Sequence, residues 1–277
     1  MFSQRIIQTM PAFRRAPSFK SAVLGGKVIP LVEFSRGDFV VKTVRSKRDL
    51  RQVQSLRYDV FHREYKQKKF PFGLDLDRFD AWSDHLVIMD QKTGCFVGTY
   101  RLLLEDRAPY FYSETEFDMS PLKALSGKKL ELSRACIHKD YRNGVVIGLL
   151  WRGLVQYVQA SGADYLFGMS SFKSTDPAGI ARAYVQLRAD KAIDETLPCL
   201  PIGNYKIPEF HEFVAIESAK GVQSPEIIPA LLKSYLRAGA KVIGEPALDE
   251  DFKCADFLTI LDMKNLGKAY ERKFKLC

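Results

Sequence analysis

The chain has 277 residues and is 46% hydrophobic, which excludes global disorder, and none of its apolar runs reaches the roughly 20 residues of a membrane span. Its five cysteines are scattered without a CxxC pair and its four histidines are isolated, so the sequence predicts neither a disulfide framework nor a metal site and suits reduced thiols in a cytoplasm. The net charge of +9 comes without a zinc-finger pattern or an aromatic-rich basic repeat, which argues against a nucleic-acid partner.

The positive charge is concentrated in the first 70 residues, which hold 16 Lys/Arg and 5 Asp/Glu, a net of +11, and leave −2 for residues 71–277. Residues 1–38 are predicted to form a basic leader that lacks the continuous apolar stretch of a signal peptide. Contact with an anionic membrane surface or an acidic protein fits its charge, while an organellar transit peptide and an unstructured tail are alternatives. The sequence therefore predicts a cytoplasmic protein, with the inner face of the cytoplasmic membrane as one surface that the leader meets.

Regular structure is predicted from residue 39 onward. Residues 39–44 have the pattern of a strand, and Ser46 is placed to cap a helix whose apolar spacing continues to Phe61. An acidic loop follows at 75–84. Strands 85–90 and 95–104, joined by a turn, predict a hairpin, and a partly helical excursion follows at 111–125.

The central unit is a strand at 129–137, a charged turn, a long apolar helix up to Val158 and a second strand at 164–170. Beyond it we predict a helix at 178–188 capped by the residues before Pro177, an irregular connector at 190–210, and a helix at 227–238 closed by Gly239. Strands at 241–246 and 257–262 complete the chain. The order of elements predicts a single mixed α/β domain over residues 39–277.

The strand at 129–137 carries polar groups where a buried strand should be apolar. Regular alternation places Glu131 and Ser133 on one face and Arg134 and Cys136 on the other, so Cys136 is predicted to be a core residue. Burial raises the pKa of a carboxyl group, which suits Glu131 to remove a proton from an ammonium group near neutral pH. The alternative is that Glu131 only orders the sheet, through an ion pair with Arg134 or Arg101.

Two further groups of polar residues precede this strand. The carboxylates of the acidic loop, Asp77, Asp80 and Asp84, are suited to hold a cationic amine substrate, and a solvated turn is the alternative reading. His85 and Asp90 have the spacing of a glycerolipid acyltransferase motif. Because residues five apart on a strand point to opposite faces, they are not expected to act as a dyad. His85 is predicted to be a packed strand-end residue or a substrate contact.

Taken together, these blocks resemble the GNAT-type N-acyltransferase superfamily and, more narrowly, the bacterial ornithine N-acyltransferase family, once labelled hemolysin-like. The matching segments run in order through residues 56–61, 79–87, 97–103, 111–118, 131–142, 149–154, 231–240 and 251–256. The resemblance implies a three-layer α/β (α+β) fold, in which helices cover both faces of a mixed central sheet. It also implies transfer of a fatty acyl group, often 3-hydroxylated, from acyl carrier protein to the α-amine of ornithine, the first step of ornithine lipid synthesis, without a tightly bound cofactor.

A second resemblance, to acyl-homoserine lactone synthases, rests on Arg57, Phe61, the acidic loop, Arg101 and the Glu131-x-Ser133-Arg134 motif. The two resemblances imply a catalytic group and an acceptor-binding group. The catalytic residues are Glu131, Ser133 and Arg134, and the substrate-binding residues are Arg57, Asp77, Asp80, Asp84, His85 and Arg101. A lactone synthase that consumes S-adenosylmethionine stays an alternative, as does an inactive fold that binds a membrane or a carrier protein. The block at 231–262 favours the amino-acid acyltransferases.

The turn after strand 129–137 is expected to bind the acyl donor, because free N–H groups at a helix start attract phosphate. The usual CoA-binding loop of the superfamily has closely spaced glycines, whereas here Val146 and Ile147 fill the gap between Gly144 and Gly148. This departure favours an acyl-4′-phosphopantetheine arm over CoA, and the basic amino-terminal third suits an acidic acyl carrier protein. The predicted donor-binding residues are Ile137, Arg142, Asn143, Gly144 and Gly148.

The predicted reaction needs no covalent acyl-enzyme, because holding the thioester and the amine in line makes their reaction effectively unimolecular. Glu131 takes a proton from the amine directly or through a water molecule. A backbone N–H of the strand, freed by local splaying of the sheet, stabilises the oxyanion. Ser133 or Tyr141 is expected to protonate the departing thiolate.

Overall fold

The computed structural model describes residues 21–24, 27–66, 72–221 and 228–266. These ranges contain a two-stranded hairpin and a ten-stranded mixed sheet. The strands are β1 Ser21–Leu24, β2 Lys27–Pro30, β3 Glu33–Arg36, β4 Phe39–Thr43, β5 Asp84–Asp90, β6 Phe96–Leu104, β7 Lys129–Ile137, β8 Tyr165–Phe172, β9 Ile193–Asp194, β10 Lys241–Ile243, β11 Ala247–Asp249 and β12 Cys254–Asp262. The helices are α1 Lys47–Tyr58, α2 Ser120–Lys123, α3 Val145–Ser161, α4 Pro177–Ala189, α5 Phe210–Lys220 and α6 Ala230–Ala238.

The strand order of the large sheet is β3-β4-β5-β6-β7-β8-β12-β10-β9, and β11 pairs with β12 beside this path. The pairs β7–β8 and β10–β9 are parallel, and the other pairs are antiparallel. α3 connects the two parallel strands β7 and β8, as a crossover between parallel neighbours requires. The predicted mixed central sheet is therefore confirmed.

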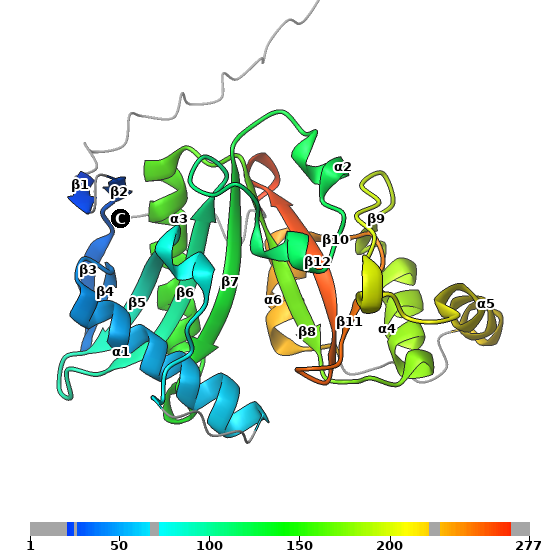
Figure 1. Ribbon diagram of the computed structural model, residues 1–277, viewed down its shortest axis with the longest axis horizontal. Coiled ribbons are helices and arrows are strands. Elements are labelled where there is room, and N and C mark those ends of the chain that lie inside the picture. Colours follow the sequence, from blue (N-terminus) through cyan, green and yellow to red (C-terminus); the bar gives the residue numbers. More distant parts are fainter. Residues whose placement is uncertain (1–20, 25–26, 67–71, 222–227, 267–277) are drawn as a thin grey trace, which may run out of the picture.

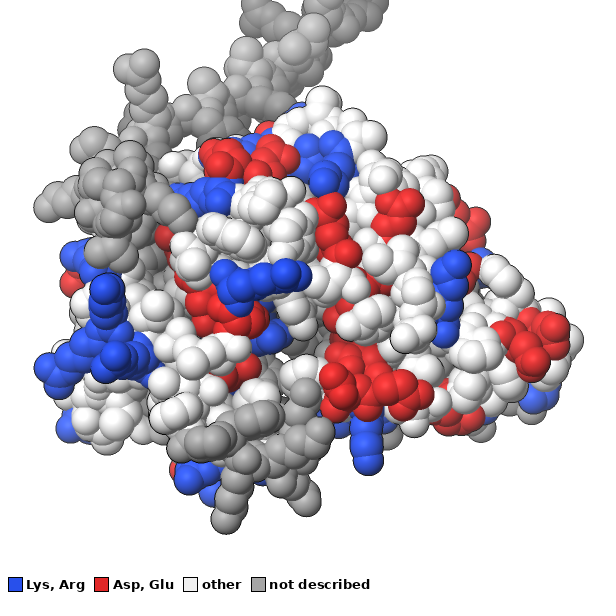
Figure 2. Space-filling model, viewed as in Figure 1, with Lys and Arg blue, Asp and Glu red and all other residues white. Residues whose placement is uncertain are grey.

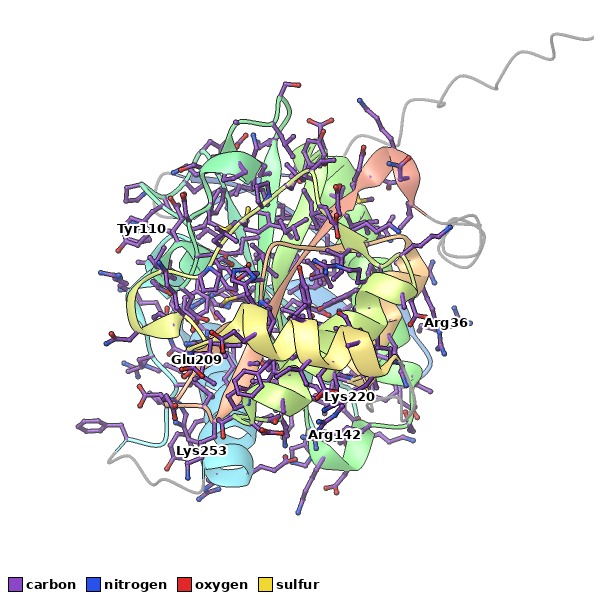
Figure 3. The ribbon with its side chains drawn as sticks, turned by 90° about the vertical axis from the view of Figure 1, so that its right-hand side faces the viewer. Arg36, Tyr110, Arg142, Glu209, Lys220 and Lys253 are labelled. Atoms are coloured by element: carbon purple, nitrogen blue, oxygen red, sulfur yellow. The ribbon has the colours of Figure 1, made fainter. Side chains whose placement is uncertain are left out.

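Helices cover both faces of this sheet (Figure 1). α1 and α2 lie on the face that we call the front, where α1 packs over β5, β6 and β7 through a cluster that includes Val53, Leu56 and Cys136. α3 and α6 lie on the rear face, in a core that includes Leu150 and Tyr235. α4 and α5 pack together at the β9 end, and α5 is the outermost element when the molecule is viewed from that side (Figure 3). The predicted three-layer arrangement is confirmed.

The sheet forks between its two central parallel strands. β7 and β8 pair only through residues 129–131 and 165–167, and beyond this point the strands diverge, as Figure 1 shows. Gly168 lies at the fork, where a Cβ atom would approach the Leu132 carbonyl oxygen to 2.2 Å. A glycine is needed there because no side chain fits between the two backbones. The predicted splaying of the strand at 129–137 is present, and it leaves the β8-facing edge of β7 without strand partners from Leu132 onward.

Several predicted helix boundaries are confirmed. The Ser46 hydroxyl accepts from the Asp49 N–H at 3.0 Å and caps α1. Asp176 caps α4, with Pro177 at its first position, and Gly239 closes α6 in the left-handed conformation. α6 begins at Ala230, after Pro229, while the proposed helix start at 224–227 lies outside the described residues.

Two features differ from the predictions. The large sheet begins at β3 and Val32 is 1% exposed, so the domain boundary lies several residues before the predicted residue 39. β3 has the sequence Glu-Phe-Ser-Arg, whose mixed polarity gives no clear strand signal. α5 was not predicted, because its apolar residues form no single stripe. Residues 1–20 of the basic leader lie outside the described residues, and none of the described helices combines the length and apolar character needed to span a bilayer.

Candidate active site

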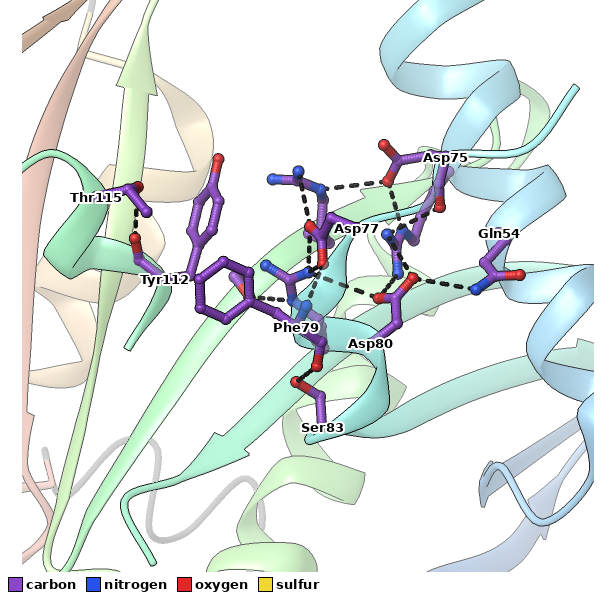
Figure 4. A network of polar contacts seen from close by, with 12 residues as sticks. Gln54, Asp75, Asp77, Phe79, Asp80, Ser83, Tyr112 and Thr115 are labelled. Atoms are coloured by element: carbon purple, nitrogen blue, oxygen red, sulfur yellow. Dashed lines mark hydrogen bonds and ion pairs between the residues drawn. The ribbon is translucent and has the colours of Figure 1, made fainter. Parts of the chain in front are cut away.

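Three arginines and three aspartates form a closed ring of alternating charges on the front face of the sheet (Figure 4). They are Arg57 of α1, Asp75, Asp77 and Asp80 of the acidic loop, Arg101 of β6 and Arg134 of β7. Each aspartate contacts two of the arginines, and each arginine contacts two of the aspartates. The structure thus brings together five predicted site residues and adds Asp75.

The contacts of this ring are short. Arg57 donates to Asp75 and to Asp80 at 2.7 Å each, and its side chain is 0% exposed. Arg134 contacts Asp75 at 3.2 Å and Asp77 at 3.1 Å, and Arg101 pairs with Asp77. The alternative reading of the loop as a solvated turn is therefore wrong. The six charges also balance, so the ring as a whole is neutral.

The electrostatics keep the ring ionised. Burial alone would raise the pKa of Asp75, but the charges of Arg134 and Arg57 hold it well below the usual range of an aspartate. Burial likewise opposes ionisation of Asp80, and Arg57 lowers its pKa. For Arg57 the two carboxylates outweigh burial and raise the pKa. A buried charge is tolerated only when it is paired in this way.

Arg134 reaches the ring because β7 contains a bulge. Thr99 pairs with Cys136 and Arg101 pairs with Ser133, so three steps on β7 oppose two on β6. Arg134 is the extra residue and has a φ of 50°, in the left-handed region that non-glycine residues rarely adopt. Its side chain consequently lies on the front face together with Ser133, whose hydroxyl accepts from Arg101 Nε at 2.8 Å.

The predicted alternation of β7 is therefore wrong beyond Ser133. Ala135 and Ile137 pack on the rear core with Leu130 and Leu132, whereas Cys136 packs on the α1 side. The prediction that Cys136 is a core residue is confirmed, since it is 7% exposed. Burial raises the pKa of its thiol to about 12, which leaves no reactive thiolate at neutral pH.

Glu131 is fully buried, and the turn at residues 111–115 provides its hydrogen bonds. Its carboxylate accepts from the N–H of Tyr112 at 2.7 Å, from the N–H of Ser113 at 2.7 Å and from the Ser113 hydroxyl at 2.6 Å. Neither Arg101 nor Arg134 lies within ion-pair distance of Glu131 in the described part of the chain, so the predicted alternative of an ion pair is wrong. Burial raises the pKa of Glu131, and these hydrogen bonds partly offset the effect.

His85 and Asp84 are neighbours on β5 that point to opposite faces. His85 pairs in register with Arg101 on the front, is 3% exposed, and stays neutral because burial lowers its pKa to about 3. Asp84 pairs in register with Leu102, accepts from the Tyr157 hydroxyl of α3 at 2.6 Å and forms an ion pair with Arg107. The predicted grouping of Asp84 with Asp77 and Asp80 is therefore corrected, because the strand pleat sends it to the rear core.

The predicted donor-binding residues lie together at the carboxyl end of β7 and the start of α3. Arg142 forms a two-pronged ion pair with Glu64, at 2.5 and 2.7 Å, and its Nε donates to the Ile137 carbonyl at 3.0 Å. The Asn143 side chain accepts from the Val145 N–H at 3.1 Å. Gly144 has a φ of 88°, and Cβ atoms placed on Gly144 or Gly148 would meet no atom within 4 Å. The surface around the helix start is thus open, although Arg142 is already paired.

Tyr112 and Glu116 are further polar residues of the front face that the sequence reasoning did not select. The Tyr112 ring packs under the guanidinium groups of Arg134 and Arg101, at 4.8 and 5.0 Å from its centroid. Glu116 is 2% exposed. Both lie within the segment 111–118 that resembles the family, which was the one sequence signal available for them. Their roles depend on contacts with strands far away in the sequence.

Comparisons with known proteins agree with this arrangement. Residues 56–152 match the family model of the acetyltransferase (GNAT) domain. The L-ornithine N(alpha)-acyltransferase of Rhodobacter capsulatus is 31% identical over 247 residues, which cover 84% of this chain and 93% of that protein. The enzyme of the same name from Agrobacterium fabrum is 31% identical over 254 residues, covering 84% of each chain.

Among solved structures, the acyl-homoserine lactone synthase LasI superposes with a TM-score of 0.50 at 14% identity, covering 86% of this chain and 94% of LasI. This likeness concerns the fold. The sequence relationship is closer and extends over most of both chains. The chain is therefore an N-acyltransferase of the GNAT superfamily, and it belongs to the L-ornithine N(alpha)-acyltransferase family.

Proposed function

We propose that this protein transfers a fatty acyl group, often 3-hydroxylated, from acyl carrier protein to the α-amine of ornithine, as the first step in making an ornithine lipid. The observation that carries the proposal is the family relationship over 84% of the chain, together with a front face that has the parts for direct acyl transfer.

The fork between β7 and β8 supports a place for the donor thioester. The edge of β7 that faces β8 has no strand partner beyond residue 131, so its N–H groups are available to the amide groups of a phosphopantetheine arm. One of these N–H groups, near Ser133, would stabilise the oxyanion formed from the thioester carbonyl. Because only a short turn separates β7 from α3, the open start of α3 with Gly144 and Gly148 lies where the phosphate of the arm would arrive.

The chemistry is a direct attack of the amine nitrogen on the thioester carbon. A C–N bond forms, the C–S bond breaks, and the thiolate leaves. We assign Glu131 as the base that receives the ammonium proton, since burial raises its pKa and only one hydrogen bond reaches its Oε2. Ser133 is the better acid for the thiolate, because Tyr141 donates its proton to Asp90 at 2.7 Å. The Ser133 hydroxyl accepts from Arg101 and keeps its own proton available.

Arg134 is the candidate for the acceptor carboxylate. Its side chain is 14% exposed, whereas those of Arg57 and Arg101 are 0% exposed. The bulge holds Arg134 next to Ser133, so a carboxylate bound there keeps the α-amine close to the thioester. Arg57, Asp77, Asp80 and Arg101 then act by fixing Arg134 and Ser133.

The reaction is tested with the purified full-length chain, a 3-hydroxyacyl carrier protein and ornithine. Mass spectrometry should detect an acyl-ornithine whose free side-chain amine identifies the α-amine as the acylated group. If S-adenosylmethionine is consumed instead and methylthioadenosine is released, the protein is a lactone synthase and the proposal is wrong. Binding of the carrier protein without product formation would indicate an inactive fold.

The carrier protein as donor is supported by a basic surface at the beginning of α1 (Figure 2). Lys47, Arg48 and Arg51 are exposed, line an open groove there, and have no described carboxylate within 4 Å. Unpaired basic groups attract an acidic partner and raise the rate of encounter. α1 slants across the front of the sheet from this basic surface toward the open end of the fork (Figure 1). The predicted contact of residues 1–38 with a membrane stays a prediction.

Reversing the charge of this basic surface tests whether acyl carrier protein, rather than CoA, delivers the acyl group. The double variant Arg48→Glu, Arg51→Glu should raise the KM for the acyl carrier protein about tenfold or more. Turnover with a soluble acyl-pantetheine should be unchanged, since that donor does not contact the carrier surface. A control with Arg63→Glu alters an exposed arginine in the helical turn that follows α1, where it is paired with Asp59. Wild-type rates with acyl-CoA that equal those with the carrier protein would contradict the proposed donor.

A further inference from the structure

A second group of buried acidic side chains lies on the front face, at the other side of the fork from the charge ring. It comprises Asp249 of β11 and Cys254 and Asp256 of β12, which are 7%, 3% and 4% exposed. One carboxylate oxygen of each aspartate and the Cys254 sulfur lie within 4.8 Å of one another. Figure 2 shows acidic side chains gathered over this end of the molecule, beside a hollow in the surface.

Glu116, which comes from a distant part of the chain, faces the same group. Its carboxyl is 2% exposed, and its Oε2 has no hydrogen-bond partner among the described residues. Burial and the nearby charges of Asp256 and Asp249 raise its pKa, and Arg134 opposes this effect. The charge of Glu131 also acts on Glu116, so Glu116 is close both to the proposed base and to the two aspartates. A buried carboxyl oxygen without a partner marks an incomplete site.

The register of the strands places this group on the same face as Glu131. Glu131 pairs with Phe167 of β8, and Asp256 pairs with Ser171 of β8, whose hydroxyl donates to Asp256 at 2.6 Å. Residues 167 and 171 are an even number apart on one strand, so they share a face. The acidic group is therefore an extension of the reaction site across the fork.

The charges of this group are not balanced by the protein. Within the described ranges, no Lys or Arg lies within 4 Å of the carboxylates of Glu116, Asp249 or Asp256, in contrast to the three aspartates of the ring. Buried carboxylates without a cation are costly unless they hold protons or bind a positively charged ligand. The two sides of the fork thus differ in net charge. The charge ring is neutral as a whole, whereas the acidic group has no cation to balance its carboxylates.

We propose that Glu116, Asp249 and Asp256 bind the side-chain ammonium group of a diamino acid acceptor, and so direct its α-amine toward Glu131. This inference rests on the proposed function, and it assigns the selection of a diamino acid to residues outside the catalytic strand. An acceptor without the second amine would leave the three carboxylates unpaired in a buried site, which disfavours its binding.

The chemistry of the group favours an ammonium ion over a metal ion. A metal would need the Cys254 sulfur as thiolate, but burial and the charges of Asp256 and Asp249 raise the pKa of this thiol. An ammonium group instead donates several hydrogen bonds to carboxylates and leaves the thiol protonated. Its arrival would also displace a proton from Glu116. The charged and titratable groups that act on Glu116 are Asp249, Asp256, Glu131, Arg134, the thiol of Cys254 and the phenols of Tyr112 and Tyr205.

The test compares ornithine with norvaline, which has the same carbon chain and lacks the second amine. With the full chain and the carrier-protein donor, wild-type kcat/KM should be about tenfold to hundredfold higher for ornithine, because a charge-assisted hydrogen bond is lost with norvaline. Asp256→Asn and Glu116→Gln should raise the KM for ornithine and leave the KM for norvaline unchanged. The matched control is Glu250→Gln, an exposed acid on the same turn, which should behave like wild type.

Calorimetry of the wild-type protein provides a second readout that needs no variant to fold. At neutral pH, ornithine binding in two buffers of different ionisation enthalpy should release protons, and norvaline binding should release none. Equal kcat/KM for both amino acids with acyl-amino-acid product would overturn the ammonium site while the acyltransferase function stands. Absence of any acylated amino acid would contradict the proposed function instead. A stoichiometric metal ion found by elemental analysis would also overturn the ammonium site.

Discussion

At the scale of single residues, Glu131 has two tasks that must be separated. It anchors the turn at 111–115 through three hydrogen bonds, and it is our candidate for the base. A buried carboxylate held by backbone N–H groups is a strong structural element in its own right. Loss of activity after its removal is therefore informative only when the fold of the turn is measured as well.

Glu131→Gln should abolish most acyl transfer while the protein remains folded. The free energy of unfolding should fall by about 1–3 kcal/mol, because the amide NH₂ of the glutamine opposes one of the backbone N–H donors. The control is Ser113→Ala, which removes the hydroxyl donor to Glu131 and keeps the carboxylate. This control should lose a similar part of the stability and retain transfer. Turnover and urea unfolding of both variants check the assignment. Full activity in Glu131→Gln would show that Glu131 is only an anchor.

At this scale the sequence predicted most of the residues that form the site, but it did not predict how they are arranged. Arg57 and Arg101 were selected from a resemblance, and Asp77 and Asp80 also from the acidic loop itself. The structure brings the four residues together. The bulge at Arg134 was missed because it has no sequence signal of its own. The polar and apolar residues of this strand fit an alternating pattern both with and without one extra residue. Glu116, Asp249 and Asp256 were missed because their meeting depends on the pairing of β8 with β12, which no local pattern specifies.

At the scale of elements, the fork between β7 and β8 links the fold to the reaction. Three paired residues on each strand hold the two halves of the sheet together, and the divergence beyond them exposes one edge of β7. Gly168 sets the place where the divergence starts, since only a glycine lets the two backbones approach there. The front face opens into two halves at the same point, with the charge ring on one side and the acidic group on the other.

Gly168→Ala should therefore reduce both stability and transfer. Its Cβ would lie 2.2 Å from the Leu132 carbonyl oxygen, so the strands must move apart, at a cost of about 1–3 kcal/mol. Ser170→Ala on the same strand is the control. It removes a buried hydroxyl that lacks a partner and should leave stability and turnover unchanged or slightly improved. Chemical unfolding and steady-state turnover measure both variants, and unaltered behaviour of Gly168→Ala would contradict the role of this glycine.

Elements with strong local signals were predicted well, and those without them were not. α1 and α4 have capping side chains and α6 has a terminal glycine, and all three were found. α5 lacks an apolar stripe, and β3 is a short edge strand of mixed polarity. Such elements form because neighbouring strands and helices cover them, so their stability comes from tertiary packing that a local pattern does not record.

At the scale of the whole molecule, the two halves of the front face respond to pH in opposite directions. The ring lowers the pKa of Asp75 and Asp80 in the folded state, so it contributes stability that is present above the unfolded pKa of about 4 and is lost as the pH falls below it. The acidic group raises the pKa of Glu116 and Asp256 through burial and mutual repulsion. It therefore contributes stability that is fully present below the unfolded pKa of about 4. This stability is lost as the pH rises from there through the raised pKa values of the two carboxyls in the folded protein.

The ligand-free protein should accordingly be most stable at weakly acidic pH, and its urea midpoint should fall between pH 5 and pH 8. Glu116→Gln removes a group that stays protonated in the folded protein while it ionises in the unfolded chain, so the decline should flatten in this variant. Glu250→Gln, with an exposed acid removed, should keep the wild-type slope. If an ammonium ligand completes the acidic group, saturating ornithine should raise the midpoint more at pH 8 than at pH 5, since the ligand binds the ionised carboxylates. A midpoint that rises steadily from pH 5 to pH 8 without ligand would contradict the charge imbalance on which this half of the site depends.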